Sequence, residues 1–146
     1  MSIFAPKSPT TMTRITDLRE LLRNMEPTLD EQTYVFATLP HADIDWAQIA
    51  QWNPVGTFRE QEGLTLIVSQ SVADSQGWNY YATFRLITLH VYSSLEAVGL
   101  TAAFATQLAS CGISANVIAA YHHDHIFVPA DQATQAMEAL DELRKG

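Results

Sequence analysis

Two kinds of hydrophobic spacing follow each other over residues 88–129, and the rest of the chain is organised around this stretch. Over its first five residues apolar and polar positions alternate, with Leu89 and Val91 on one face, which predicts a strand. Apolar residues then recur every three or four positions over residues 97–111, which predicts a helix. Gly112 follows where a helix C-terminus favours a residue that accepts positive φ. The pattern therefore predicts a strand, a loop and a helix in succession.

The remainder of this stretch predicts a hairpin and a second helix. Residues 116–121 alternate, His123-Asp124 is expected to form the turn, and residues 126–128 return along a neighbouring strand. Residues 131–143 then carry apolar positions at helical spacing, with Asp131 as the expected N-cap. The patterns after residue 88 therefore give the order βαββα.

Shorter patterns precede this block. They predict a helix over 16–27 capped by Thr16, and then a strand over 32–39. A short helix is expected within 41–54, capped by Asp43 or Asp45, followed by a hairpin of 58–60 and 64–68 whose turn holds Gly63 at positive φ. The last of these elements is a helix over 69–76, capped by Ser69 and closed by Gly77. An unusually long strand pattern covers residues 82–92. We expect it to serve two halves of the chain, closing the first sheet through Phe84 and Leu86 and opening the second through Leu89 and Val91.

Three sequence segments give this order of elements a family resemblance. SSLEAVGLTA at residues 93–102 and GISANVIAAYHHDHIFV at residues 112–128 resemble the ACT domain, and GTFREQEGLTLIV at residues 56–68 resembles a companion ACT-like unit. More narrowly, the chain is similar to small stand-alone tandem ACT proteins of bacteria, which are related to the ACT repeats of eukaryotic cytosolic arginine sensors.

The resemblance implies an α+β fold of two ferredoxin-like βαββαβ halves that share a long central strand. It implies an N-terminal half over residues 14–83 and a C-terminal ACT-like domain over residues 84–146. Residues 1–13 show no periodicity and are expected to form a flexible arm. No residue-level repeat relates the two halves.

Composition narrows the classes of partner. The 146 residues suffice for one compact domain or two small halves, and the hydrophobic content of 47% is typical of a globular protein. The net charge of −8 (8 basic minus 16 acidic residues) and the lack of a basic cluster argue against a nucleic-acid partner. Cys111 is the single cysteine, so no intrachain disulfide forms, and its place on an apolar helical face favours packing over catalysis. Without a signal-peptide or membrane-span pattern, we expect a cytoplasmic protein.

The loop before the first helix of the second half is the strongest candidate binding site. It comprises Ser93, Ser94, Leu95, Glu96, Ala97, Val98 and Gly99. Free backbone N–H groups at the start of a helix bind carboxylates or phosphates without a basic side chain, although a serine here can also serve simply as a helix cap. Glu96 suits an α-ammonium group or, equally, the helix dipole. In ACT domains the matching loop binds the backbone of an amino acid effector, usually at an interface between two units.

The second candidate is the histidine-rich turn, Tyr121 to His125. Three histidines around Asp124 suit a metal site, a solvated hairpin tip or a ligand-selecting site. Alternation opposes the metal reading, because it directs His123 and His125 to one side and His122 and Asp124 to the other. In the arginine-sensing relatives an Asp at the matching place faces the cationic end of the ligand. The neighbouring histidines distinguish this chain from those relatives and suggest a pH-sensitive site.

The sequence therefore predicts a regulatory or sensor protein that binds a small amino acid, with no enzymatic activity and no cofactor. The strand containing Ile118, Ala120 and Tyr121 is expected to offer carbonyl oxygens to the ammonium group, and Asp124 to select the side chain. Binding at an interface implies a homodimer. The alternatives are a metal-dependent enzyme built on residues 122–125 and an interaction module without a ligand. No motif of a hydrolase, P-loop or dinucleotide-binding protein occurs.

Overall fold

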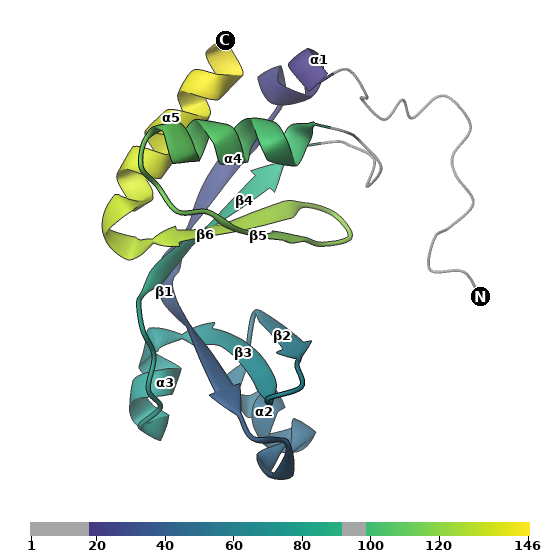
Figure 1. The fold of residues 1–146 in the computed structure, drawn as a ribbon, viewed down its shortest axis with the longest axis vertical. Coiled ribbons are helices and arrows are strands. Elements are labelled where there is room, and N and C mark those ends of the chain that lie inside the picture. Colours follow the sequence, from purple (N-terminus) through teal and green to yellow (C-terminus); the bar gives the residue numbers. More distant parts are fainter. Residues whose placement is uncertain (1–17, 92–98) are drawn as a thin grey trace, which may run out of the picture.

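A single antiparallel sheet of six strands forms the framework of the computed structural model, which describes residues 18–91 and 99–146 (Figure 1). The elements of the described residues are α1 (Leu18–Arg23), β1 (Glu26–Leu39), the 3₁₀ turn η1 (His41–Asp43), α2 (Trp46–Trp52), β2 (Gly56–Arg59), β3 (Leu64–Ser69), α3 (Gln70–Gln76), β4 (Phe84–His90), α4 (Leu100–Ser110), β5 (Asn116–Ala119), β6 (Asp124–Pro129), the 3₁₀ turn η2 (Ala130–Gln132) and α5 (Ala133–Lys145). The strands lie in the order β2-β3-β1-β4-β6-β5.

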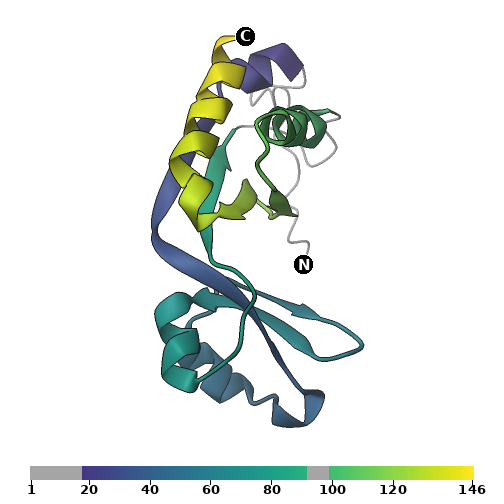
Figure 2. The ribbon, with the colours of Figure 1, turned by 60° about the vertical axis from the view of Figure 1, so that its left-hand side comes forward.

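The two central strands, β1 and β4, serve both halves of the sheet. In a βαββαβ unit the fourth strand lies beside the first. In the N-terminal half β1 is the first strand and β4 the fourth, whereas in the C-terminal half β4 is first and β1 fourth. The shared strand predicted over residues 82–92 is therefore confirmed as β4, within shorter bounds. The second shared strand, β1, has 14 residues and runs through both lobes (Figure 2).

Strand β1 changes partner along its length and contains an irregularity at the change. Its C-terminal part pairs with β3, its N-terminal part pairs with β4, and the register shifts within residues 29–33. The Asp30 carboxylate accepts hydrogen bonds from Gln32 N–H at 2.8 Å and from the Tyr34 hydroxyl at 3.2 Å. The Arg85 guanidinium donates to the carbonyl oxygen of Asp30, with Nε at 3.1 Å. These bonds satisfy the backbone where the ladder is interrupted and fix the position of the bulge.

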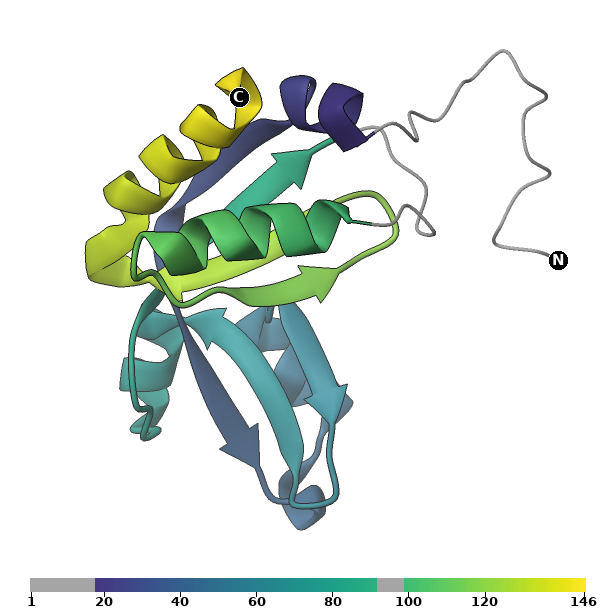
Figure 3. The same ribbon diagram turned by 45° about the horizontal axis from the view of Figure 1, so that its top comes forward.

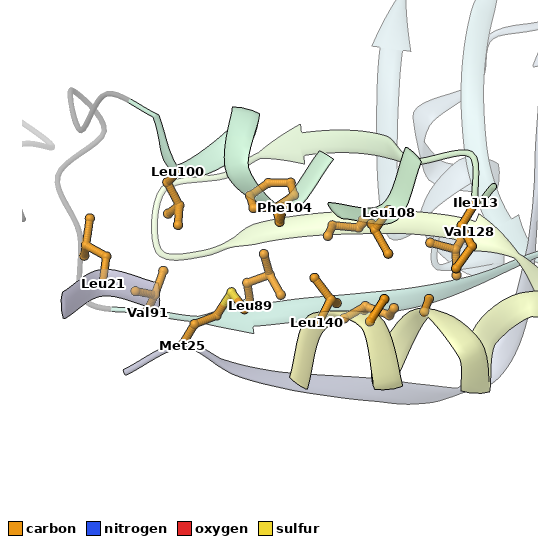
Figure 4. Packing of buried hydrophobic residues seen from close by; sticks show 14 residues of the cluster. Leu21, Met25, Leu89, Val91, Leu100, Phe104, Leu108, Ile113, Val128 and Leu140 are labelled. Atoms are coloured by element: carbon orange, nitrogen blue, oxygen red, sulfur yellow. The ribbon is translucent and has the colours of Figure 1, made fainter. Parts of the chain in front are cut away.

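Helices cover one face of the sheet in each half and bury a separate core there. The larger core lies under α1, α4 and α5 (Figure 4) and contains Leu21, Met25, Ile87, Leu89, Val91, Leu100, Phe104, Leu108, Ile113, Ile126, Val128, Ala136, Ala139 and Leu140. The smaller core lies under α2 and α3 and contains Val35, Leu39, Ile49, Leu64, Leu66, Val68 and Ala73. On the opposite, helix-free face a third cluster joins the halves through Tyr34, Ile67, Leu86 and Phe127.

Helix α1 packs with the half that is distant from it in sequence. Leu21 and Met25 are fully buried in the larger core, although the sequence-based division at residues 83 and 84 placed them in the N-terminal half. Helix α1 contacts both α4 and α5, so it lies beside the C-terminal helix (Figure 1). The C-terminal half is therefore completed by the segment that precedes the N-terminal half.

Several predicted caps agree with the structure. The Asp45 carboxylate accepts hydrogen bonds from Ala47 N–H and Gln48 N–H at the start of α2. The Ser69 hydroxyl accepts from Val72 N–H at the start of α3, and Gly77 ends that helix at a φ of 70°.

Three local predictions were wrong. Gly63 does not have positive φ; a Cβ there would lie 2.5 Å from the carbonyl oxygen of Leu39, so glycine is needed for close backbone approach. Asp131 lies in η2 and does not cap α5. The first helix ends at Arg23, and Pro27, which seemed to end it, lies in β1, where its missing N–H is tolerated near the strand start.

Candidate functional site

The candidate site lies where β4 ends beside the tip of the β5–β6 hairpin. Ala120 N–H donates to the carbonyl oxygen of His123 at 3.0 Å, so Tyr121 and His122 form the tip and the predicted turn at His123-Asp124 lies two residues too late. The His90 ring at the end of β4 lies 4.5 Å from the His123 ring. The hairpin tip is thus held against the strand that leads into residues 93–98.

Asp124 lies on the helix-covered face of the sheet. It is directly opposite Leu89 in the register, and Leu89 is fully buried in the larger core. Burial raises the pKa of the Asp124 carboxyl, and the nearby His125 and His123 partly offset this. The carboxylate makes no side-chain hydrogen bond or ion pair within residues 18–91 and 99–146. It is therefore a half-buried acceptor that a cation would stabilise.

The histidines lie on the other, helix-free face, as alternation predicted for His123 and His125. The His125 ring, through Nδ1, lies 3.0 Å from the Thr88 hydroxyl, and the His90 ring, through Nε2, lies 3.0 Å from the Thr28 hydroxyl. These contacts tie imidazoles of β4 and β6 to threonines of the neighbouring strands.

Burial and neighbouring histidines lower the pKa values of His123 and His125. Burial lowers the pKa of His123, and the nearby His90 and His122 lower it further. Burial lowers the pKa of His125, and the nearby His123 and His90 lower it further. Among the residues that the structure describes, the buried Nδ1 atom of His123 has no hydrogen-bond partner. His123 and His125 are therefore harder to protonate than a histidine in water.

The metal-site alternative finds no ligand set in this arrangement. No group of three or more His, Cys, Asp or Glu side chains in the described ranges is placed to hold a metal ion. Asp124 lies on the face opposite to His125, and the Thr88 and Thr28 hydroxyls occupy a nitrogen of His125 and of His90. Within residues 122–125, the candidate ligands Asp124 and His125 thus lie on opposite faces, as alternation predicted.

Of the predicted loop, residues 93–98 lie outside the described residues, and Gly99 is the described member. Its φ of 96° is left-handed, and its carbonyl oxygen accepts from Ala103 N–H at 2.9 Å in the first turn of α4. A Cβ at this position would lie 3.2 Å from Cδ2 of Leu18. Gly99 thus allows α4 to begin close against α1. The buried Phe104 follows four residues after Leu100, the first residue of α4.

Strand β5 is the edge of the sheet and presents backbone groups beside the hairpin tip. Because Ala120 bonds inward to His123, alternation directs the backbone groups of Ile118 inward as well. The outward groups then belong to Val117 and Ala119. The Ile118 side chain lies across from His125 on the helix-free face and is partly exposed, and half of the Tyr121 side chain is exposed. Ile118 and Ala120 therefore contribute side chains at this edge, whereas free carbonyl groups come from their neighbours.

Sequence reasoning missed three polar residues of this region. Thr88 and His90 contact the histidine-rich hairpin, and Thr28 contacts His90, only because β4 lies between β1 and β6. The alternation that placed His90 on the face away from Leu89 was a usable signal, but the partner strands were not evident from it.

Comparison with known proteins identifies two domain matches in tandem. One ACT domain family model matches residues 13–85 and a second matches residues 82–142. No match was found among curated proteins. Within the two described ranges, no helix has both the length and the apolar composition needed to cross a membrane.

Solved structures give the same fold. A Vibrio cholerae protein of unknown function, described as a possible transport protein, is 49% identical, with a TM-score of 0.79 over 90% of this chain and 99% of that chain. An Agrobacterium tumefaciens protein is 14% identical, with a TM-score of 0.67 over 83% and 90%. The regulatory subunit of aspartate kinase from Thermus flavus is 11% identical, with a TM-score of 0.57 over 80% and 95%. With its two domain matches and its reciprocal pair of central strands, the chain belongs to the ACT-domain family.

Proposed function

We propose that this protein is a regulatory module that binds a free amino acid and has no catalytic activity of its own. Two ACT units in tandem support a ligand-binding regulatory role. The observation that carries the choice of an amino acid is Asp124, a half-buried carboxylate without an ion-pair partner in the described residues. Such a group gains most from a cationic ligand, which the ammonium group or a basic side chain of an amino acid provides.

The proposed binding mode divides the ligand between two elements. Its carboxylate lies on the backbone N–H groups of residues 94–97, and outward carbonyl groups of β5 face its ammonium group. Asp124 then selects the ligand side chain, which favours a basic or hydrogen-bond-donating one. The position of Asp124 supports this mode. Asp124 lies on the helix-covered face directly opposite Leu89, and Leu89 is near the end of β4, the strand that leads into the loop.

A thermal-shift screen against the twenty amino acids tests the proposal. A ligand at 100 times its Kd adds about 2.7 kcal/mol to the free energy of unfolding. For a chain of this size that corresponds to a rise in Tm of roughly 5–10 °C. One amino acid should give such a shift, and its side chain will show what Asp124 recognises. A screen with no shift at saturating concentrations would refute amino acid binding and favour the interaction module.

Variants of the proposed contacts sharpen the test. Asp124→Asn should weaken binding of the amino acid by about tenfold or more, because a charge-assisted hydrogen bond is lost. Asp131→Asn is the matched control: Asp131 is exposed in η2, at the other end of β6, and should leave the affinity unchanged. Ser94→Pro removes a backbone N–H donor and should abolish binding while the circular dichroism spectrum stays the same. Unchanged affinity in both Asp124→Asn and Ser94→Pro would exclude this site.

We further propose that the protein is a homodimer, because ACT units commonly pair and β5 leaves a sheet edge unpaired within the described chain. Multi-angle light scattering should give twice the monomer mass of 16.2 kDa. A monomer with and without the bound amino acid would exclude the dimer but not the ligand.

A further inference from the structure

A second candidate binding site lies on the helix-free face of the sheet, lined by residues of both halves. Figure 3 shows these two halves, with β2 and β3 in one and β5 and β6 in the other. A pocket of about 460 Å³ there is lined by Phe36, Thr38, Thr65, Asn79, Tyr80 and Tyr81, among others. A smaller pocket of about 170 Å³ shares Phe36 and Tyr81 and adds Phe84 and Asn116. Because the two pockets share walls, they form one groove, which we name the junction groove. Its larger part lies within the size range of small-molecule sites.

The side chains of the junction groove are aromatic or polar apart from two alanines, and none carries a charge at neutral pH. The Phe36 ring is fixed by edge contacts with Phe84, at 5.2 Å between centroids, and with Phe127, at 5.4 Å. The Tyr81 side chain, in contrast, is fully exposed at 108% of its reference area. A planar ring in the groove would contact both, and would cover a Tyr81 ring that now lies wholly in water.

Hydrogen bonding distinguishes the walls of the groove from its free polar groups. The Tyr80 hydroxyl donates to Asp74 Oδ1 at 2.8 Å and accepts from Gln70 Nε2 at 3.0 Å, so its ring is held in place. By contrast, the Thr38 hydroxyl and the Asn79 carboxamide make no hydrogen bond within residues 18–91 and 99–146. These two groups can donate to and accept from ring nitrogens or carbonyl groups of a ligand.

We propose that the junction groove binds an uncharged heteroaromatic small molecule, with its ring against Phe36 and Tyr81 and its polar edge on Thr38 and Asn79. The groove offers no cation to a carboxylate or phosphate, and the net charge of −8 disfavours an anion further. A zwitterionic amino acid lacks partners here, so this site is separate from the one in the proposed function. Asn116 of β5 lines the smaller part of the groove and Thr65 of β3 the larger part, so the groove as a whole is lined from both halves of the sheet.

Amide NMR of the full chain tests the proposal, with adenine and indole as uncharged probes. At least one probe should give saturable shift changes at the amides of Phe36, Thr38, Asn79 and Tyr81. Adenosine monophosphate, which adds a phosphate to adenine, should bind more weakly than adenine. The proposal is overturned if neither probe saturates these amides, if the changes lie elsewhere, or if the monophosphate binds more tightly.

Two pairs of variants locate the contacts. Tyr81→Ala should weaken probe binding about fivefold or more through lost stacking, whereas Tyr121→Ala, outside the groove, should not. Thr38→Val keeps the side-chain shape and should weaken binding of the probe about two- to tenfold through a lost hydrogen bond. Equal affinity of Tyr81→Ala and the parent protein overturns the proposal. A lower molecular mass in solution for Tyr81→Ala than for the parent protein would also overturn the proposal, because it would mean that a second copy of the chain covers this face. An amino acid found in the thermal-shift screen should not displace the probe, so the two sites succeed or fail separately.

Discussion

Replacement of Phe104 by alanine tests whether the two halves unfold as one unit. Phe104 is 0% exposed and lies in the middle of α4, between the sheet and the other helices of the larger core (Figure 4). Truncation of a buried phenylalanine to alanine costs about 3–5 kcal/mol. With a cost of about 4 kcal/mol and a change of roughly 2–4 °C per kcal/mol for this chain length, Tm should fall by roughly 8–16 °C.

The informative part of this prediction concerns the half that Phe104 does not touch. Strands β1 and β4 each belong to both halves, so loss of the C-terminal core should release the strands that hold the N-terminal half. Hydrogen exchange at the amides of Leu66 and Val68, in the centre of β3, should therefore accelerate. A loss of about 4 kcal/mol in the free energy of unfolding corresponds to roughly a thousandfold faster exchange.

A variant of the smaller core and a variant of an exposed side chain serve as controls. Ile49→Ala is the reciprocal variant. It truncates a side chain of the smaller core and should accelerate amide hydrogen exchange in β6, which belongs to the other half. Phe58→Ala, at 71% exposure, should change the free energy of unfolding by less than about 0.5 kcal/mol. If Phe104→Ala accelerates exchange only in the C-terminal half and leaves Leu66 and Val68 protected, the halves unfold independently and the argument from shared strands is wrong.

Three further predictions follow from local features. Stability in urea should fall as the pH decreases from about 7.5 to 5, because the folded-state pKa values of His123 and His125 lie below the unfolded value of 6.5 and protons therefore bind preferentially to the unfolded chain. Gly63→Ala should destabilise the fold by more than about 1 kcal/mol in the same assay, because its Cβ would lie 2.5 Å from the Leu39 carbonyl oxygen. Asp45→Ala should cost about 1 kcal/mol through loss of the cap of α2, measured by thermal unfolding.

Each of these predictions has a matched control. His123→Gln should flatten the pH dependence of stability, whereas His41→Gln, remote from the cluster, should not; equal slopes would contradict the assignment. Gly56→Ala would meet only Ile67 Cδ1, at 3.4 Å, and should be milder than Gly63→Ala; a reversed order would exclude close approach as the cause. Asp43→Ala removes a neighbouring carboxylate that caps nothing in α2, and a loss equal to that of Asp45→Ala would contradict the capping role.

Local signals in the sequence predicted the helices with definite ends and the separation of the histidines. Ser69 and Gly77 bracket α3 because each supplies a specific backbone requirement, a hydroxyl acceptor and a left-handed conformation. Alternation placed His123 with His125 and opposite to Asp124 because a strand has only two faces.

What the sequence left unpredicted depends on partners that are distant along the chain. The first residues of β1 are mostly polar, contain Pro27 and run into a bulge, so no alternation reveals them as a strand. Their pairing with β4 decides their conformation. The junction groove is a similar case, since Phe36 of β1 and Tyr81 of the connection from α3 to β4 line the same pockets although they are distant in the sequence.

The pairing of β1 with β4 also has a consequence for synthesis on the ribosome. Glu26 pairs with His90, which is translated 64 residues later. Helix α1 and the first part of β1 therefore emerge long before the strand and helices that cover them, while the rest of β1 finds its partner β3 much sooner. The nascent chain must carry the first part of β1 unpaired until β4 is made, and the apolar side of α1 uncovered until α4 and α5 are made. Exposed apolar surface of this kind is what chaperones recognise. The N-terminal half can thus begin to fold during translation, but the C-terminal half closes only by capturing α1 and the first part of β1, which were made earlier.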